Sequence, residues 1–253
     1  MVEVVVFSGP TIGAAEARTY LDALYLPPVG QGDLVRAVLQ HAPSAIAVID
    51  GVFAQRPAVR HKEILWAIAR GVRVYGAASM GAIRAAELYD CGMVGQGLVF
   101  RWYRRTSLAD DADVAVAMAP PEFGSHALSE ALIDMRMTLK KAERAGVIGR
   151  KLRILLEQSA RSLHFIERTY ATTLSVVGHD PGLKKDIHNL NNWLASGIVR
   201  QKKSDAIRLL TLLSLPDGPM YAPQKPVIFE LTDAFAYDLK YSNLDGICSE
   251  NLY

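Results

Sequence analysis

The sequence predicts an α/β fold with a mainly parallel sheet and flanking helices, followed by a largely helical C-terminal region. In the first half of the chain, short apolar runs rich in β-branched residues alternate with helical patterns, as is typical of strands buried on both faces of a parallel sheet. After about residue 125 the apolar residues recur at helical spacing instead. We therefore expect an α/β core over residues 1–145 and a helical C-terminal region over residues 146–253.

The elements of the core are read from apolar periodicity and from Gly and Pro punctuation. The predicted strands are residues 2–7, 45–50, 72–75, 98–103 and 114–118. The predicted helices are residues 14–24, a segment that opens at Gly32-Asp33 with Asp33 as its N-cap, 61–70 and 82–89. Alternating strands and helices with crossover connections favour a parallel sheet.

The second half has the periodicity of helices. The predicted helices are residues 128–145, 151–174, 183–195 and 204–213. Residues 227–231 are predicted to be a last strand or an extended arm.

Composition excludes several classes of protein. Half of the 253 residues are apolar, which excludes intrinsic disorder, and a net charge of +2 is too small to indicate nucleic-acid binding. Two cysteines, Cys91 and Cys248, cannot form a disulfide scaffold or a cysteine-rich metal site. The N-terminus lacks a basic leader and no run of about 18 apolar residues occurs, so we expect a cytoplasmic protein without a membrane partner.

Charge is unevenly distributed along the second half. Residues 150–203 hold 10 basic and 4 acidic side chains, whereas residues 204–253 hold 3 basic and 7 acidic ones. We favour pairing of these segments within the chain, and the alternative is an acidic partner for the basic segment.

The carboxyl ends of the predicted strands define the place to look for a site, because ligands bind there in open parallel sheets. The first strand ends at Ser8, Gly9 and Thr11, and the second ends at Asp50-Gly51. The third runs into residues 76–81, a turn of small residues. We expect these loops to meet at one edge.

Ser79 stands at the strand-to-helix turn, where a nucleophile elbow places its serine. Backbone N–H groups of Gly51 or Met80 would stabilise an oxyanion there. The match is partial, because Ala77 replaces the glycine expected two residues before the serine. The alternative interpretation is a small packing residue before a helix.

A serine nucleophile needs a base. His61, at the start of the next helix, is the first candidate and Lys62 the second, with Asp50 or Glu63 as the group that orients the histidine. The alternative is that the three residues 61–63 form only a charged helix N-terminus.

The remaining motifs do not match known metal or nucleotide sites. Asp110, Asp111 and Asp113 lack the glycine and distal glutamate of a calcium loop, and the histidines lack metal-ligand spacing. The glycine-rich strings lack the features of a phosphate or dinucleotide loop. We expect no metal and no cofactor.

The chain resembles the TfuA-like family over most of residues 2–145. The matching strings are Val6-Phe7-Ser8-Gly9-Pro10-Thr11, Leu26-Pro27-Pro28 with Gly32-Asp33, Ile49-Asp50-Gly51-Val52-Phe53, His61-Lys62-Glu63-Ile64-Leu65, Val74-Tyr75-Gly76-Ala77-Ala78-Ser79-Met80-Gly81-Ala82, Arg84-Ala85-Ala86-Glu87-Leu88 and Asp110-Asp111. One departure is Arg60, where the family pattern has Trp.

The resemblance implies a role beside a YcaO-type enzyme, which activates peptide amides with ATP and, with its TfuA-like partner, installs thioamides in ribosomally made peptides. It implies as partners that enzyme and a sulfur-carrier protein or other sulfide donor, with the precursor peptide as a further candidate. It does not assign a catalytic residue.

The string Gly76-Ala77-Ala78-Ser79-Met80-Gly81-Ala82 is also similar to the nucleophile turn of Clp-type serine peptidases. That resemblance carries over to Ser79 as the nucleophile. In that family the base follows the serine in sequence, which keeps His126 as a third candidate beside His61 and Lys62.

Together these observations favour a serine hydrolase that releases sulfide from a thiocarboxylated sulfur carrier. The alternative is a non-catalytic module that docks the sulfur donor or the peptide. A persulfide relay ranks last, since neither Cys91 nor Cys248 lies at the expected edge.

Overall fold

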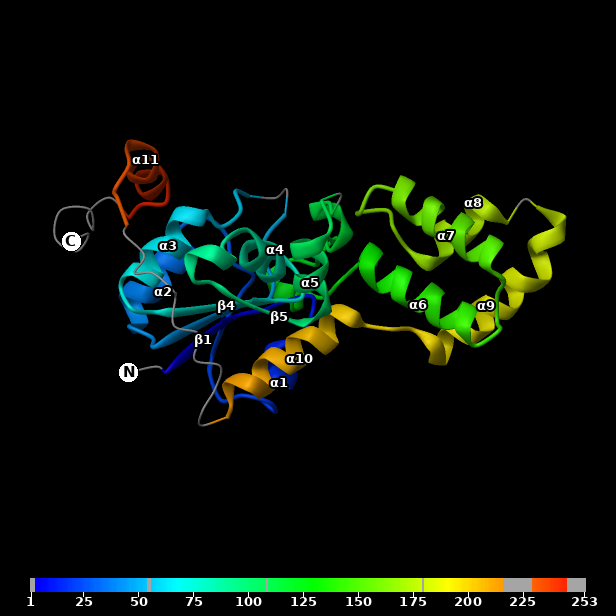
Figure 1. Ribbon diagram of the computed structural model, residues 1–253, viewed down its shortest axis with the longest axis horizontal. Coiled ribbons are helices and arrows are strands. Elements are labelled where there is room, and N and C mark those ends of the chain that lie inside the picture. The colour runs from blue at the N-terminus through cyan, green and yellow to red at the C-terminus, as the bar shows by residue number, and fades with distance from the viewer. Residues whose placement is uncertain (1–2, 54–55, 108, 179, 216–228, 245–253) are drawn as a thin grey trace.

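The computed structural model describes residues 3–53, 56–107, 109–178, 180–215 and 229–244. A sheet with its covering helices forms one end of the molecule, and a group of helices extends away from it at the other end (Figure 1). Within the described ranges, no helix is both long and apolar enough to cross a membrane.

The sheet confirms the predicted α/β class. Its strands are β1 (Val4–Phe7), β2 (Leu24–Leu26), β3 (Ala45–Val48), β4 (Arg73–Ala77) and β5 (Val94–Gln96). All of them pair in parallel, in the order β2-β1-β3-β4-β5. The strand order reverses between β1 and β3, and the crevice beyond the carboxyl ends of those two strands is where such sheets bind ligands.

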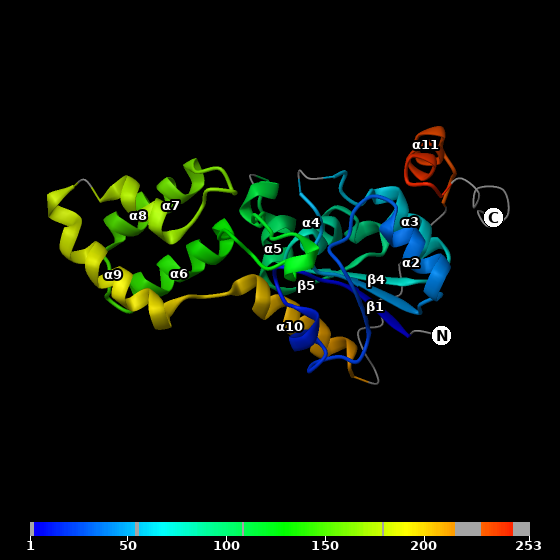
Figure 2. The same cartoon turned by 180° about the vertical axis from the view of Figure 1, so that it is seen from behind.

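Both faces of the sheet are covered, which explains why β1 and β3 are continuously apolar. In β1, Val5 and Phe7 belong to one apolar cluster while Val4 and Val6 belong to the other. The first cluster includes residues of α2 (Asp33–His41), α3 (His61–Ala69) and α11 (Asp233–Tyr241). The second includes residues of α1 (Ala14–Ala17) and α10 (Gln201–Leu213), which lie side by side in both ribbon views (Figure 2).

Further helices follow β4 and β5. They are α4 (Met80–Glu87), η1 (Tyr89–Cys91), α5 (Gly97–Arg105), η2 (Asp111–Asp113) and η3 (Pro121–Phe123). Apolar residues of α4 and α5 pack together with Val114, Ala131 and Ile133, so this group links the sheet to the helices that follow.

The helical part has an apolar core of its own. Its helices are α6 (Leu132–Arg144), α7 (Arg150–Ser162), α8 (Tyr170–Val177), η4 (Pro181–Leu183) and α9 (Lys184–Gly197). Leu139, Leu152, Leu156 and Leu190 are buried together at its centre. From α9 the chain returns to the sheet, where α10 packs (Figure 1).

Two predicted strands are wrong. Residues 98–103 lie in α5, and residues 114–118 form no strand, only an isolated bridge from Met118 to Ala127. Helix α5 begins at Gly97, where φ is +95°, and the carboxylate of Asp205 on α10 accepts the N–H of Val99 at 2.7 Å. Because the capping carboxylate lies 106 residues away, the sequence near Gly97 contains no signal for the start of a helix.

Smaller differences concern short elements and element ends. Strands β2 and β5 were not predicted, because three residues are too few to reveal the apolar periodicity of a strand. The helix predicted over 14–24 stops at Ala17, and the one predicted over 151–174 is divided into α7 and α8. Gly32 takes the N-cap position of α2, and the Asp33 carboxylate accepts the N–H of Gly30 at 2.9 Å.

The C-terminal segment differs as well. Of the strand or arm predicted over 227–231, residues 227 and 228 lie outside the described residues, and 229–231 have no regular structure. Helix α11 was not predicted, and its Phe235 and Leu239 are buried in the first apolar cluster.

Candidate functional site

The loop after β1 is fastened to the end of β3 by one carboxylate. Oδ2 of Asp50 accepts the N–H groups of Gly9 and Thr11 at 2.9 and 3.0 Å, and Oδ1 accepts the Thr11 hydroxyl at 2.6 Å. Asp50 is 1% exposed. Because both of its oxygens are engaged by this loop, the side chain shapes the carboxyl edge of the sheet rather than orienting a histidine.

Ser79 occupies the turn between β4 and α4, as the sequence indicates. The preceding residue, Ala78, has φ of +69°, a left-handed conformation that is uncommon for a residue with a Cβ. Gly76 and Gly81 make this tight turn feasible: a Cβ on Gly81 would overlap the carbonyl of Val48, and one on Gly76 would overlap the carbonyl of Gly81. The small residues therefore bring α4 directly onto β3 and β4.

Backbone donors lie beside Ser79. The first hydrogen bonds of α4 run from Ala82 and Ile83 to the carbonyl of Ser79, so the N–H of Met80 precedes the intrahelical series. Gly51 lies against the Met80 side chain, since a Cβ on Gly51 would meet it at 2.5 Å. The two predicted oxyanion donors, Gly51 and Met80, are thus neighbours.

Ser79 lines a small cavity with a volume of about 220 Å³. Its other lining residues are Pro10, Asp50, Gly51, Phe53, Val116, Ala117, Met118, Phe165 and Ile166. The Ser79 side chain is 2% exposed, and its hydroxyl makes no hydrogen bond to any group in the described part of the chain. The hydroxyl is therefore free to bond to a ligand.

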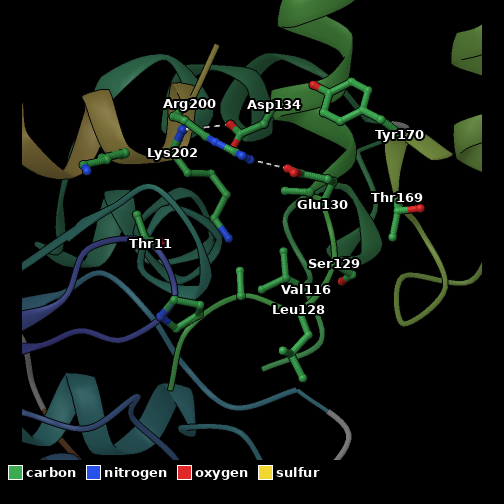
Figure 3. Close-up of a pocket in the computed structure, with 14 residues that line it drawn as sticks. Thr11, Val116, Leu128, Ser129, Glu130, Asp134, Thr169, Tyr170, Arg200 and Lys202 are labelled. Atoms are coloured by element: carbon green, nitrogen blue, oxygen red, sulfur yellow. Dashed lines mark hydrogen bonds and ion pairs between the residues drawn. The ribbon is translucent and has the colours of Figure 1, made fainter. Parts of the chain in front are cut away.

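A larger polar cavity of about 360 Å³ adjoins the first and shares Pro10 and Val116 with it. It lies where the sheet edge meets α6, α8 and the start of α10 (Figure 3). Its lining includes Thr11, Ser129, Glu130, Asp134, Thr169, Tyr170, Arg200 and Lys202. Arg200 forms an ion pair with Glu130 across this cavity.

Lys202 reaches into the cavity from α10. In Figure 3 its side chain extends toward Thr11 and Val116. The residue is 4% exposed, and its ammonium donates to the carbonyl of Val114 at 2.7 Å. Burial lowers the pKa of Lys202, although the charges of Asp50 and Asp134 oppose that shift. A buried lysine with a lowered pKa is suited to accept a proton.

Asp134 on α6 fixes the position of Lys202. Its Oδ1 accepts the backbone N–H of Lys202 at 3.0 Å. Burial raises the pKa of Asp134 to about 6, against the attraction of Lys202. The cavity thus combines a buried amine, a buried carboxyl group and hydroxyls at the switch point of the sheet.

The structure does not bring His61 to this cavity. His61 lies at the start of α3, and its Nε2 is 2.8 Å from the carboxylate of Glu87. Its side chain is 46% exposed. It lines neither of the two cavities described above.

The other predicted bases also lie elsewhere. The ammonium of Lys62 donates to the carbonyl of Glu230 at 3.1 Å and lies over the ring of Phe229. His126 is exposed, and its Nδ1 is 3.0 Å from the carbonyl oxygen of Phe123. Neither residue lines the two cavities.

The carboxylate of Glu63 accepts hydrogen bonds from the backbone instead of orienting His61. It is 1% exposed and accepts the N–H of Gly32 at 2.9 Å and of Arg60 at 3.0 Å, which joins the starts of α2 and α3. Burial raises the pKa of Glu63 to about 7. Ser8 is buried beside the site, where its N–H donates to the carbonyl of Leu26 at 3.1 Å.

The described residues hold no cluster of His, Cys, Asp and Glu suited to a metal ion. The Asp110 side chain accepts the N–H of Ala112 at 2.9 Å, and Asp113 is buried near Trp102. Cys91 is exposed and unpaired at the end of η1, and Cys248 lies outside the described residues.

Sequence reasoning missed Lys202 and Asp134. Both sit in helical patterns where a charged residue ordinarily faces solvent, and 68 residues separate them. Only the packing of α10 beside α6 brings them to the edge formed by β1 and β3.

Fold and site define a parallel α/β protein whose polar cavity lies at the switch point of the sheet. The sequence model of the TfuA-like protein family matches residues 50–169, which confirms the resemblance found from the motifs. The matched segment includes Asp50 and Ser79 and ends before Lys202. No curated protein matches the chain.

Proposed function

We propose that the protein supplies sulfide to a YcaO-type enzyme by hydrolysing the thiocarboxylate at the C-terminus of a sulfur-carrier protein. The observation that carries the proposal is the placement of Ser79 at the carboxyl edge of the sheet. Its hydroxyl, which has no hydrogen-bond partner among the described residues, lines a cavity beside the N–H of Met80 and next to the cavity that holds Lys202.

The chemistry is acyl transfer. Oγ of Ser79 bonds to the carbonyl carbon of the thiocarboxylate, and its proton passes to the neutral amine of Lys202. The N–H groups of Met80 and Gly51 donate to the oxyanion, each such donor being worth about 3 kcal/mol of barrier. The C–S bond then breaks and sulfide leaves with the proton from Lys202. Water hydrolyses the serine ester and restores a carboxylate.

Lys202 replaces His61 as the proposed proton acceptor. Lys202 lines the adjoining cavity and burial lowers its pKa, so a larger share of the amine is neutral. His61 is engaged by Glu87 instead.

A non-catalytic docking module is the second candidate. The observation that favours it is the same free hydroxyl, because no base is hydrogen-bonded to Ser79 in the described part of the chain. In that case the two cavities hold the carrier terminus or the peptide beside the YcaO-type enzyme without reacting with it.

Sulfide release from a purified thiocarboxylated carrier, without the YcaO-type enzyme, tests the proposal. We expect release by the wild type and none by Ser79→Ala. Ser44→Ala is the matched control, because Ser44 lies at the amino end of β3, away from the cavities, and should release sulfide at the wild-type rate. Thermal unfolding of all three proteins verifies the fold.

The remaining outcomes reject the hydrolase mechanism. Equal release by wild type and Ser79→Ala would exclude a serine nucleophile. No release by either, together with thioamidation when the YcaO-type enzyme is added to both, would indicate the docking module.

A further inference from the structure

A groove with a strongly basic lining lies between α5 and α6. Its volume is about 670 Å³. We call it the basic groove and define it by its cationic residues Arg101, Arg105, Arg136, Lys140, Lys141 and Arg144. No acidic side chain lines it. This groove is separate from the two cavities at the sheet edge, with which it shares no lining residue.

None of these six cations forms an ion pair in the described part of the chain. The acids of α6 are engaged elsewhere: Asp134 accepts the N–H of Lys202, and Glu143 pairs with Arg153 at 2.6 Å. Helix α5 has no acidic residue. The described residues therefore leave the positive charge of the groove uncompensated.

The cations follow helical rows. On α5, Arg101 and Arg105 are four residues apart, and on α6 Arg136, Lys140 and Arg144 repeat at the same interval. Residues at that interval share a helix face, where like charges repel. An arrangement that repels itself is stabilised when an anion binds.

The rest of the lining is mostly apolar. It consists of Leu98, Trp102, Ile133, Met137 and Val199, with Thr106 as the one uncharged polar residue among the lining residues. The guanidinium of Arg136 lies 4.8 Å from the centroid of the Trp102 ring, and its Nη1 is buried without a hydrogen-bond partner in the described residues. A buried guanidinium nitrogen without an acceptor favours a ligand that brings a carboxylate.

We propose that the basic groove binds an acidic amphipathic helix of a partner protein. An apolar stripe on such a helix fits the lining between α5 and α6, and Asp or Glu side chains on both sides of the stripe meet the two cationic rows. Single-stranded nucleic acid fits less well, because Arg136 already covers the Trp102 ring on which a base would stack.

The proposal is independent of the Ser79 chemistry, and its test needs no sulfur carrier. The probe is a fluorescein-labelled amphipathic peptide of Leu and Glu at helical spacing, followed by fluorescence anisotropy at physiological salt. A scrambled peptide of the same composition, single-stranded DNA and phosphatidylserine vesicles serve as competitors. We expect the helical Leu-Glu peptide to bind and none of the competitors to displace it at equal concentration.

Charge reversal tests the groove itself. Arg136→Glu with Lys140→Glu should weaken peptide binding at least about tenfold. The matched control, Lys185→Glu with Arg208→Glu, changes the net charge equally at exposed positions outside the groove and should leave binding within about twofold. The reversed pair should fold, because it relieves repulsion within the row, and circular dichroism verifies this.

A third variant tests the apolar contact. Met137→Asp removes apolar lining and should also weaken binding about tenfold. Equal loss in the control pair, no loss in Met137→Asp, or displacement of the peptide by DNA or vesicles would overturn the proposal.

Discussion

Asp134 on α6 accepts the backbone N–H of Lys202 on α10 at 3.0 Å, although 68 residues separate the two in the chain. This bond joins a helix of the helical part to the helix that packs on the sheet. It also fixes the first turn of α10, from which the Lys202 side chain enters the polar cavity. The cavity therefore depends on how the helical part meets the sheet.

The first prediction concerns the pH dependence of stability. Burial raises the pKa of Asp134 from 3.8 to about 6, so between these values the folded state holds a proton that the unfolded chain releases. The resulting stabilisation is complete below pH 3.8 and is lost as the pH rises through 6. Asp134→Asn keeps an oxygen that accepts the Lys202 N–H but does not titrate.

Urea unfolding of both proteins at about pH 4.5 and about pH 7.5 measures the effect. The free energy of unfolding of the wild type, relative to Asp134→Asn, should fall by about 2 kcal/mol between these two pH values. Glu63, whose pKa burial also raises, is present in both proteins and cancels in the difference. A pH-independent difference would show that Asp134 does not titrate in this range.

The α/β class was predictable because a strand that is buried on both faces of a sheet consists of a continuous apolar run in the sequence. Strands β1 and β3 are continuous apolar runs, and the helices between them, α1 and α2, begin after Gly13 and Gly32. The ends of the predicted strands were enough to predict that residues 8–11, Asp50 and Ser79 lie at one edge of the sheet. The position of Gly51 beside Met80 was predictable in the same way, and their role as oxyanion donors stays a prediction.

What the sequence could not show depends on contacts across the chain. Residues 98–103 are rich in the apolar and aromatic residues typical of a strand, yet they form a helix whose start is capped by the distant Asp205. His61 begins the helix between β3 and β4 and was therefore expected at this edge of the sheet. It does not line the cavity, because its imidazole is bound to Glu87 on α4. Lys202 enters the site only because α10 returns to the sheet.

The second prediction concerns the pH profile of the proposed hydrolysis. Because burial lowers the pKa of Lys202, the sulfide-release rate of the wild type should rise with pH as the amine loses its proton. Lys202→Met, which has a similar length and no titrating group, should lower the rate about 10²- to 10⁴-fold and remove this rise.

Initial rates of sulfide release across a pH series check this expectation. Lys151→Met removes an exposed cation from α7 and should keep both the rate and the profile of the wild type. If Lys202→Met retained the wild-type profile, the proton acceptor would have to be another group.

The last prediction concerns the cap that Asp205 supplies to α5. Oδ2 of Asp205 accepts the N–H of Val99 at 2.7 Å, and Oδ1 accepts the side-chain amide of Gln201 at 2.8 Å. Asp205 is 4% exposed, so no water can easily replace it as the partner of that buried N–H. Its negative charge also interacts favourably with the positive end of the α5 dipole.

Asp205→Ala should therefore lower the free energy of unfolding by about 2 kcal/mol. Hydrogen exchange should increase first at the start of α5, whereas β1 and β3 keep their protection. Asp233→Ala is the control, since Asp233 is an exposed acid at the start of α11 and its loss should cost less than about 0.5 kcal/mol. Uniform loss of protection over the sheet and α5 alike would mean that Asp205 supports the whole α10 packing, and not the α5 cap in particular.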